Sequence, residues 1–254
     1  MNIACSTLCF SSKSLEGALR RIAEMEFSRV EIAMVENLAH LNPSEIAKDT
    51  VAAVRRIRSG PSLSPVAFYL GIATDDATEY LRQFEAVCKL AKILTVTCVT
   101  IPTAPVGSDM GTEIRRLREL SALASAEGVT LSVENHVGRL AQDPAVAVSL
   151  CNAVPGLGLT LDPSHYVNGP HQNRDYSEVF PYVQHVHLRD SGTAPNQAQV
   201  QIGQGLIEYS RIMSQLERYH FRRNMSVEIL EDAGSSLDVE TEVRKLKLLL
   251  ESLE

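Results

Sequence analysis

The sequence predicts a single (β/α)8 TIM barrel of the α/β class that occupies residues 1–254. Three observations support this prediction. Eight apolar, strand-like runs alternate with eight helix-like segments along the chain. The chain has 254 residues, and barrels of this kind typically need about 250. No Gly/Ser-rich linker divides the chain, so one domain is expected. An open doubly wound sheet also fits the alternation, but eight units in this length favour the closed barrel.

The predicted strands are short runs rich in aliphatic and β-branched residues, as expected of a parallel sheet buried on both faces. The absence of Trp fits such an aliphatic core. Pro102 and Pro105 end the fourth run, because proline cannot donate to a strand ladder. The strands are expected at residues 2–9, 29–33, 64–71, 94–101, 129–134, 156–161, 184–188 and 225–229.

The predicted helices show apolar residues at helical spacing, and several have recognisable ends. Ser14 is placed to cap the first helix, and Asn42-Pro43 and Asp143-Pro144 are typical helix starts. Gly128 stands where a helix end needs a left-handed residue. After the helix at Ser14, the others are expected at residues 42–58, 77–91, 112–127, 143–153, 173–182, 207–219 and 237–253.

The charge and the cysteines exclude several classes of protein. The chain carries 24 Lys and Arg against 31 Asp and Glu, a formal net charge of −7. A nucleic-acid or anionic-membrane binder needs a basic footprint, so neither partner is expected. No apolar run approaches the ~18 residues of a membrane span, and the first residues lack a secretory leader pattern. The five cysteines form no CxxC, which predicts reduced thiols in a cytoplasmic protein.

Three common catalytic or nucleotide-binding motifs are missing from the sequence. No GxGxxG follows the first strand and no GxxxxGK[ST] occurs, so dinucleotide and P-loop sites lack their glycines. No GxSxG occurs either, which leaves a hydrolase serine unsupported.

Acidic and imidazole side chains stand near the predicted carboxyl ends of strands five to eight. In a barrel these ends meet at the mouth, where active sites form. A buried carboxylate is costly unless it is paired, hydrogen-bonded or bound to a metal, so a shared cation is favoured over four independent polar strand ends. Three carboxylates and one imidazole suit one divalent ion, Mn²⁺, Co²⁺, Zn²⁺ or Mg²⁺. The predicted metal ligands are Glu134, Asp162, His187 and Glu228.

Four further residues are candidates for substrate binding, each with a structural alternative. His165 lies beyond the acidic end of strand six, where it contacts substrate, supports a ligand or caps a helix. Glu31, at the end of the second strand, is either a residue of the mouth or an ion-pair partner in the barrel core. His136 follows the glutamate of strand five and either touches substrate or braces its loop. Arg189 follows strand seven and either contacts substrate or pairs with Asp190.

Five segments, in this order along the chain, resemble the xylose isomerase-like TIM-barrel superfamily, also described as sugar phosphate isomerases/epimerases. The likeness covers nearly the whole chain in strand order and is specific mainly over residues 129–229. Each segment alone is a weak signal, whereas the ordered set is a strong one. The segments are Val133-Glu134-Asn135-His136, Leu161-Asp162-Pro163-Ser164-His165, His185-Val186-His187-Leu188-Arg189-Asp190, Gly203-Gln204-Gly205 and Val227-Glu228.

The resemblance implies roles for particular residues. It implies one divalent metal held by the four predicted ligands. In the ketose 3-epimerases of the superfamily, the glutamates of strands five and eight also form a proton-transfer pair. This implies that Glu134 and Glu228 are catalytic and face opposite sides of a substrate carbon. His165 matches a histidine that contacts substrate, and the glycines Gly203 and Gly205 match a loop before the seventh helix.

The sequence therefore predicts a metal-dependent isomerase or epimerase of a sugar or another polyhydroxy carbonyl compound. A carboxylate removes the proton beside a carbonyl, and the metal stabilises the enediolate. Returning the proton to the other carbon is isomerisation, and returning it to the opposite face is epimerisation. Loss of a β-hydroxyl would instead make the protein a metal-dependent dehydratase, like the dehydroshikimate and inosose dehydratases of the superfamily. A non-catalytic sugar-binding or scaffold barrel is the alternative from another class.

The chain departs from the DNA-repair branch of the superfamily. Endonuclease IV uses three metals and needs extra histidines near strands three and four and an Asp-x-His after strand seven. Here strand three ends Phe68-Tyr69-Leu70-Gly71 and strand four ends Thr100-Ile101-Pro102-Thr103, and no Asp-x-His follows Asp190. We therefore expect a small sugar-like substrate and no nucleic acid. Superfamily members are often dimers or tetramers, and a homo-oligomer is compatible with this chain.

Overall fold

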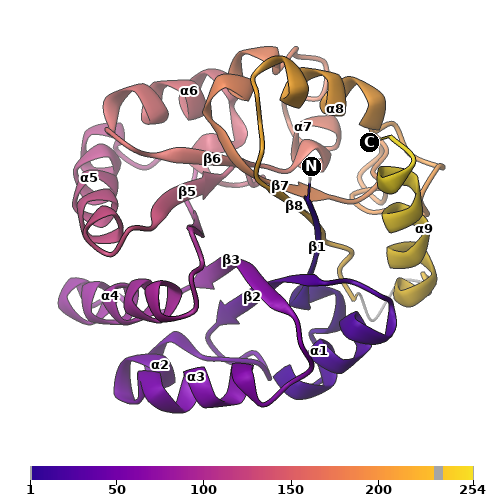
Figure 1. The fold of residues 1–254 in the computed structure, drawn as a ribbon. Helices are drawn as coiled ribbons and strands as arrows, with labels where there is room; N and C mark the ends of the chain where they lie inside the picture. Colours follow the sequence, from indigo (N-terminus) through magenta and orange to yellow (C-terminus); the bar gives the residue numbers. More distant parts are fainter. Residues whose placement is uncertain (1, 232–236, 254) are drawn as a thin grey trace.

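Eight parallel strands form a closed barrel in the computed structural model, which describes residues 2–231 and 237–253. Each strand pairs with its neighbours in sequence order, and β8 pairs with β1 to close the barrel. Figure 1 shows the strands at the centre and the helices around them. The strands are β1 (Asn2–Ser6), β2 (Arg29–Val35), β3 (Ser64–Gly71), β4 (Cys98–Pro102), β5 (Thr130–Glu134), β6 (Gly158–Leu161), β7 (Val183–Leu188) and β8 (Asn224–Val227). The predicted (β/α)8 barrel is confirmed.

The helices cover the outside of the barrel and bury their apolar faces against it. In α8, for example, Ile212, Met213 and Leu216 are buried. The helices are α1 (Leu15–Glu24), α2 (Pro43–Lys48), α3 (Thr50–Arg58), α4 (Ala77–Ile93), α5 (Met110–Ala126), α6 (Pro144–Ala153), α7 (Pro163–Val167), α8 (Tyr209–Arg218) and α9 (Val239–Glu251), with 3-10 turns η1 (Thr7–Phe10), η2 (Leu140–Gln142) and η3 (Ser177–Tyr182). Within the described ranges, no helix is long and apolar enough to cross a membrane.

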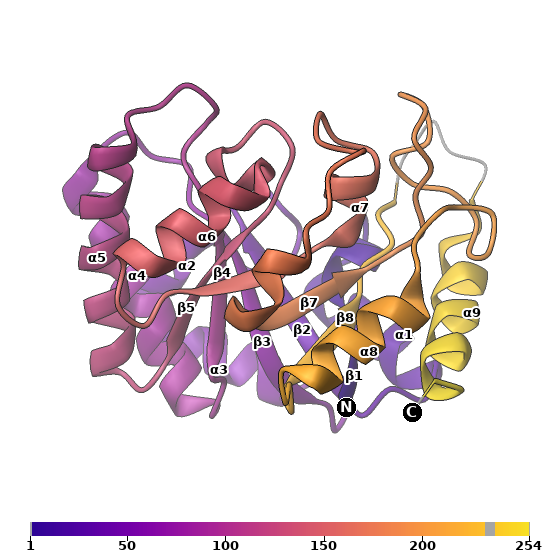
Figure 2. The ribbon, with the colours of Figure 1, turned by 90° about the horizontal axis from the view of Figure 1, so that it is seen from above.

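The two ends of the barrel differ. Figure 2 shows both chain termini at one end, and α7 with the longer loops at the other. The carboxyl ends of the strands open at this second end, which we call the mouth. Among the longer connections there is the one from β7 to α8, which spans residues 189–208.

The interior of the barrel is polar beneath the mouth. Side chains of a strand alternate between its two faces, so His185 and His187 of β7 point the same way. His185 Nε2 lies 3.0 Å from Ser226 Oγ of β8. Elsewhere in the barrel, the hydroxyl of Thr100 on β4 lies 2.7 Å from the hydroxyl of Thr160 on β6. The inward face therefore carries hydrogen-bonding groups rather than the aliphatic layers usual in such barrels.

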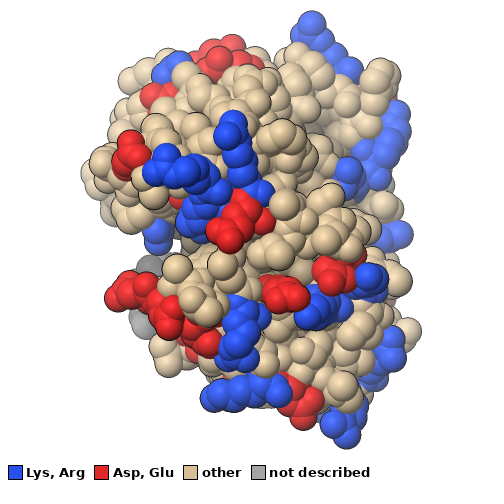
Figure 3. Space-filling view, turned by 90° about the vertical axis from the view of Figure 1, so that its left-hand side faces the viewer, with Lys and Arg blue, Asp and Glu red and all other residues tan. Residues whose placement is uncertain are grey.

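The outer surface carries charges of both signs. Figure 3 shows Lys and Arg interspersed with Asp and Glu on one face of the molecule. On α4, Arg82 pairs with Glu79 at 2.7 Å and Lys89 pairs with Glu85 at 2.7 Å. Such exposed pairs add little stability, but they leave this face without the single-sign field that a nucleic-acid binder would need.

Two predicted elements end or break where a side chain or a backbone turn intervenes. The helix expected at 42–58 is two helices, because Asp49 leaves the helical conformation and its carboxylate accepts the N–H of Ala52 at 2.9 Å. The strand expected at 94–101 begins only at Cys98. Its first residues complete the end of α4, where Thr95 has a φ of 58° and Val96 N–H donates to Ala91 O at 2.8 Å. Apolar character alone cannot separate a helix end from a strand start.

Other differences affect the mouth. The first strand stops at Ser6 and turns into η1, so residues 7–9 are not strand as expected. β8 stops at Val227, which places Glu228 just beyond the strand. The short helix α7 follows β6 directly and was not predicted. Its N-cap is Asp162, whose carboxylate accepts the N–H of Ser164 at 2.8 Å.

Candidate metal and active site

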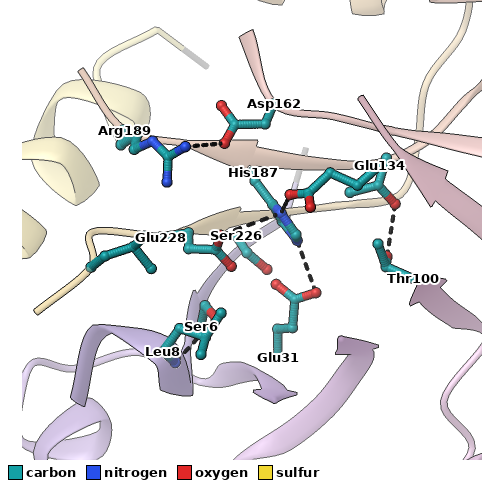
Figure 4. Close-up of polar contacts among 12 residues, drawn as sticks. Ser6, Leu8, Glu31, Thr100, Glu134, Asp162, His187, Arg189, Ser226 and Glu228 are labelled. Atoms are coloured by element: carbon teal, nitrogen blue, oxygen red, sulfur yellow. Dashed lines mark hydrogen bonds and ion pairs between the residues drawn. The ribbon is translucent and has the colours of Figure 1, made fainter. Parts of the chain in front are cut away.

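The acidic and imidazole residues predicted at the strand ends converge at the mouth (Figure 4). Glu134 is the last residue of β5, and His187 is the last but one of β7. Asp162 and Glu228 each follow the end of a strand. All four side chains are buried. The arrangement of the strands thus brings these four side chains together at the mouth from four separate parts of the chain.

His187 lies at the centre of the cluster and is contacted by three carboxylates. Its Nδ1 is 2.9 Å from Glu134 Oε1 and 3.6 Å from Glu228 Oε1, and its Nε2 is 3.0 Å from Glu31 Oε1. Burial opposes a charge on the ring, but the three carboxylates outweigh it and raise the pKa of His187 well above its usual value. The protein without a cation therefore holds an imidazolium here.

The cluster fits a divalent cation. Glu134, His187 and Glu228 offer ligand atoms that all lie within 4.8 Å of one another. Glu134 Oε2 and Glu228 Oε2 are buried and have no hydrogen-bond partner. Buried carboxylate oxygens without partners are costly, and a divalent cation would satisfy both.

Asp162, the fourth predicted ligand, lies outside that group of three and faces Arg189. Arg189 Nη2 is 3.0 Å from Asp162 Oδ2, and Arg189 Nε donates to Ser164 Oγ at 2.8 Å. Burial raises the pKa of Asp162, but Arg189 and then His165 outweigh it and lower the value to about 2. The aspartate is therefore ionised. Its Oδ2 forms the ion pair with Arg189 but accepts no hydrogen bond of normal geometry.

Asn135 fixes the position of Asp162. Its Nδ2 donates to Asp162 O at 2.8 Å, and its Oδ1 accepts Asp162 N–H at 2.7 Å. One buried amide therefore holds both backbone groups of the aspartate from the neighbouring strand end. Sequence reasoning did not single out Asn135, although its place directly after Glu134 is a usable signal.

Glu31 lies inside the barrel rather than at its rim. It is the third residue of β2 and is fully buried. Its two oxygens face two histidines, Oε1 at 3.0 Å from His187 Nε2 and Oε2 at 3.3 Å from His185 Nε2. Despite burial, the two histidines lower the pKa of Glu31. The placement matches the core-partner interpretation of Glu31.

His136 and His165 lie next to each other above Glu134. Their ring centroids are 4.2 Å apart, and His136 Nδ1 is 2.6 Å from Val137 O. His165 Nε2 lies 3.1 Å from Arg189 Nη2. Burial lowers the pKa of His165 to about 4, so the ring is neutral near pH 7 and can accept hydrogen bonds. Both histidines thus lie beside Glu134, and Arg189 lies beside Asp162.

Arg189 and Asp190 do not pair with each other, contrary to the alternative given above. Asp190 instead binds the backbone of the following loop. Its Oδ2 accepts the N–H groups of Gly203 at 2.8 Å and Gly205 at 3.0 Å, and its Oδ1 accepts Ser191 N–H at 3.0 Å. This anchors the loop from β7 to α8, which includes the predicted glycines.

Tyr69 is a further residue of the site that sequence reasoning missed. It comes from β3, and its ring centroid lies 6.0 Å from that of His187. Burial raises the pKa of Tyr69 well above its usual value, and the charges of Glu134 and Glu228 add to the effect. The phenol therefore stays protonated and can donate. The segment Phe68-Tyr69-Leu70 does not reveal which of its side chains faces inward.

Comparison with known protein families identifies the family of this chain. A family model described as Xylose isomerase-like TIM barrel matches residues 19–251. The chain belongs to this family. No curated protein gave a match.

Several solved structures have a similar fold and align along nearly the whole chain. A xylose isomerase-like TIM barrel protein from Mycobacterium smegmatis in complex with magnesium is 19% identical, with a TM-score of 0.76 over 100% of this chain and 98% of that chain. The 3-keto-D-glucoside 4-epimerase YcjR from E. coli is 15% identical, with a TM-score of 0.73 over 99% of both chains. The probable 3-DHS dehydratase AsbF from Bacillus anthracis is 16% identical, with a TM-score of 0.72 over 97% and 99%. At these identities the likeness shows the fold.

Proposed function

We propose that the protein is a divalent-metal-dependent isomerase or epimerase of a sugar or a related polyhydroxy carbonyl compound. The observation that carries this proposal is that Glu134 and Glu228, from the ends of β5 and β8 on either side of β7, both approach His187 Nδ1, at 2.9 and 3.6 Å (Figure 4). Two carboxylates on opposite sides of one bound carbon can remove a proton from one face and return it to the other. Family membership and the epimerase among the similar structures support the same reaction class.

We assign Glu134, Asp162, His187 and Glu228 as the residues that would hold the ion. Glu134 Oε2 and Glu228 Oε2, which are buried without a hydrogen-bond partner, support this assignment. When bound, a divalent ion supplies positive charge that polarises a substrate carbonyl and lowers the cost of negative charge on its oxygens. Mn²⁺, Co²⁺, Zn²⁺ and Mg²⁺ all suit the donor set, and the similar structure with magnesium supports a divalent ion.

The side chains of the mouth transfer the proton and bind the substrate. One of Glu134 and Glu228 takes the proton from the carbon beside the carbonyl, and the other donates a proton to the opposite face or the adjacent carbon. His136, His165 and Arg189 bind the hydroxyl groups of the substrate, because they lie beside the proposed ligands Glu134 and Asp162. Glu31 acts on the substrate only through His187. Tyr69 donates a hydrogen bond within the site.

A metal-dependent dehydratase of a polyhydroxy ketone is the second candidate. It shares the first step, removal of a proton beside the carbonyl, and differs in that the electrons then expel a β-hydroxyl group. The similar fold of a probable dehydratase supports it. The two reactions yield different products from the same substrate. Epimerisation conserves the formula, whereas dehydration releases water and leaves an absorbing enone.

Incubation with candidate ketoses in D₂O, with Mn²⁺ present, tests both reactions. We expect deuterium at the carbon beside the carbonyl and loss of this exchange in Glu134→Gln and Glu228→Gln. Glu113→Gln is a matched control, because Glu113 is a buried glutamate that pairs with Arg116 on α5. An enone product would favour the dehydratase. No exchange, with sugar binding unaffected by either glutamine variant, would favour a non-catalytic barrel.

We further propose a cytoplasmic location and a small-molecule substrate. All five cysteines are buried free thiols, which is typical of a reducing compartment.

A further inference from the structure

The first strand stops short of its neighbours at the mouth. β1 ends at Ser6 and the chain turns into η1, whereas β2 continues to Val35. On the other side, β1 pairs with β8 only as far as Cys5 opposite Val227. The backbone groups beyond these points therefore lack a strand neighbour on the β1 side. Buried backbone groups need partners, so something else must supply them.

Side chains of η1 take the place of the missing strand. On the β2 side, Thr7 Oγ1 accepts Ala33 N–H at 2.9 Å. On the β8 side, the thiol of Cys9 donates to Val227 O at 3.5 Å, and its sulfur accepts Ile229 N–H at 3.2 Å. Cys9 is fully buried. A thiol is suited to both contacts, because it is at once a weak donor and a weak acceptor.

The two groups that Cys9 contacts flank Glu228. The N–H of Glu228 itself donates to Leu188 O of β7 at 2.9 Å. The backbone around Glu228 is thus held by Leu188 of β7 on one side and by Cys9 on the other. Further out, the Glu231 carboxylate accepts Ser12 N–H at 2.7 Å, so the chain is also joined to residue 231 just beyond η1.

We infer that Cys9 is a positioning residue that fixes the backbone on both sides of Glu228 and so sets where the Glu228 carboxylate meets the cation. The inference rests on the proposed function only in that Glu228 is taken as a ligand. Without the thiol, Val227 O and Ile229 N–H lose their buried partner, and the segment that ends β8 can shift. A metal ligand held to a looser support binds its ion more weakly.

The test compares Cys9→Ala, Cys9→Ser and Cys88→Ala in the full chain. Cys88 is the matched control, because it is an equally buried free thiol on α4, remote from the mouth. Mn²⁺ titration gives the dissociation constant, and hydrogen exchange gives the protection of the Ile229 amide. We expect Cys9→Ala to weaken Mn²⁺ binding about tenfold relative to Cys88→Ala, within the range for supporting residues. Cys9→Ser should recover part of the affinity, because a hydroxyl also donates and accepts.

Faster exchange of Ile229 in Cys9→Ala, with no change in Cys88→Ala, is expected alongside the weaker binding. Unchanged exchange of Ile229 in Cys9→Ala would overturn the inference whatever the metal affinity. Equal Mn²⁺ affinity in Cys9→Ala and Cys88→Ala would also overturn it, provided that Glu228→Gln weakens binding. If the wild-type protein binds no Mn²⁺, the proposed metal site fails separately, and exchange of Ile229 alone decides whether Cys9 holds this backbone.

Discussion

His187 Nε2 lies 3.0 Å from Glu31 Oε1, so the imidazole at the centre of the mouth is supported from inside the barrel. The other ring nitrogen, Nδ1, faces Glu134 at 2.9 Å. With a cation on the Nδ1 side, Glu31 would hold the remaining ring proton on Nε2 and keep the ring orientation. Metal binding must then displace the Nδ1 proton that the carboxylates stabilise in the free protein.

The first prediction concerns Glu31 as the support of His187. Glu31→Gln keeps the shape of the side chain but removes the charge that orients the imidazole. We expect the Mn²⁺ dissociation constant to rise about 10- to 100-fold, the usual effect of removing such an outer partner. Isothermal titration would measure it, with Glu113→Gln as the control. Equal affinity in the wild type and Glu31→Gln would show that His187 needs no such support.

Alternation along the strands made the fold and much of the site predictable. The run His185-Val186-His187-Leu188 places both imidazoles on one face, and the structure turns that face inward. Eight such runs of suitable length leave few alternatives to a closed barrel. The carboxyl ends of all strands meet at one mouth. Glu134 at the end of one strand is therefore expected to lie near polar residues at the ends of the other strands, such as His187 and Glu228.

Contacts between distant parts of the chain were not predictable in the same way. Arg189 has Asp190 beside it in sequence but pairs with Asp162, because the turn into α7 carries that carboxylate toward β7. Asp190 turns to the backbone of Gly203 instead. The role of Cys9 depends on where β1 stops, and an apolar run does not mark that point.

The second prediction concerns the buried pair of Arg189 and Asp162, whose side chains are 6% and 1% exposed. Arg189→Met leaves Asp162 without its partner, and breaking such a pair typically costs about 3–5 kcal/mol. We expect a lower Tm for the metal-free variant. Added Mn²⁺ should raise its Tm more than that of the wild type, because the cation then offsets the Asp162 charge. Thermal unfolding with EDTA and with Mn²⁺ measures both effects.

A matched control for this experiment is Arg82→Met, which removes an exposed pair with Glu79. Its effect should stay below about 1 kcal/mol and should not depend on Mn²⁺. Equal Mn²⁺-induced shifts in Arg189→Met and the wild type would mean that the cation does not contact Asp162.

The third prediction concerns the pH dependence of stability. Burial raises the pKa of Glu228 to about 7, and although His187 opposes the shift, Glu134 and Glu31 reinforce it. The folded protein thus binds this proton more tightly than the unfolded chain, whose value is 4.5. The resulting stability is present below pH 4.5 and is lost as the pH rises through 7.

Glu228→Gln removes this pH-dependent loss of stability, because the glutamine side chain does not titrate. The metal-free variant should come closest to the wild type near pH 4.5, and the difference between their free energies of unfolding should shift in favour of the variant as the pH rises to 8. Denaturant unfolding in EDTA at several pH values measures the difference. Asp162, whose pKa is lowered, acts only below its usual 3.8 and leaves this window unaffected. A difference that stays constant from pH 4.5 to 8 would contradict the raised pKa of Glu228.

The fourth prediction concerns the anchor of the loop between β7 and α8. A Cβ at Gly205 would overlap the Asp190 carboxylate, which holds the N–H groups of Gly203 and Gly205. Gly205→Ala should therefore destabilise the protein by about 1–3 kcal/mol and speed hydrogen exchange of the Gly203 amide. Gly111→Ala is the control, because a Cβ there meets only ordinary side-chain contacts. If both variants left exchange at Gly203 unchanged, the carboxylate of Asp190 would not be what holds this loop over the mouth.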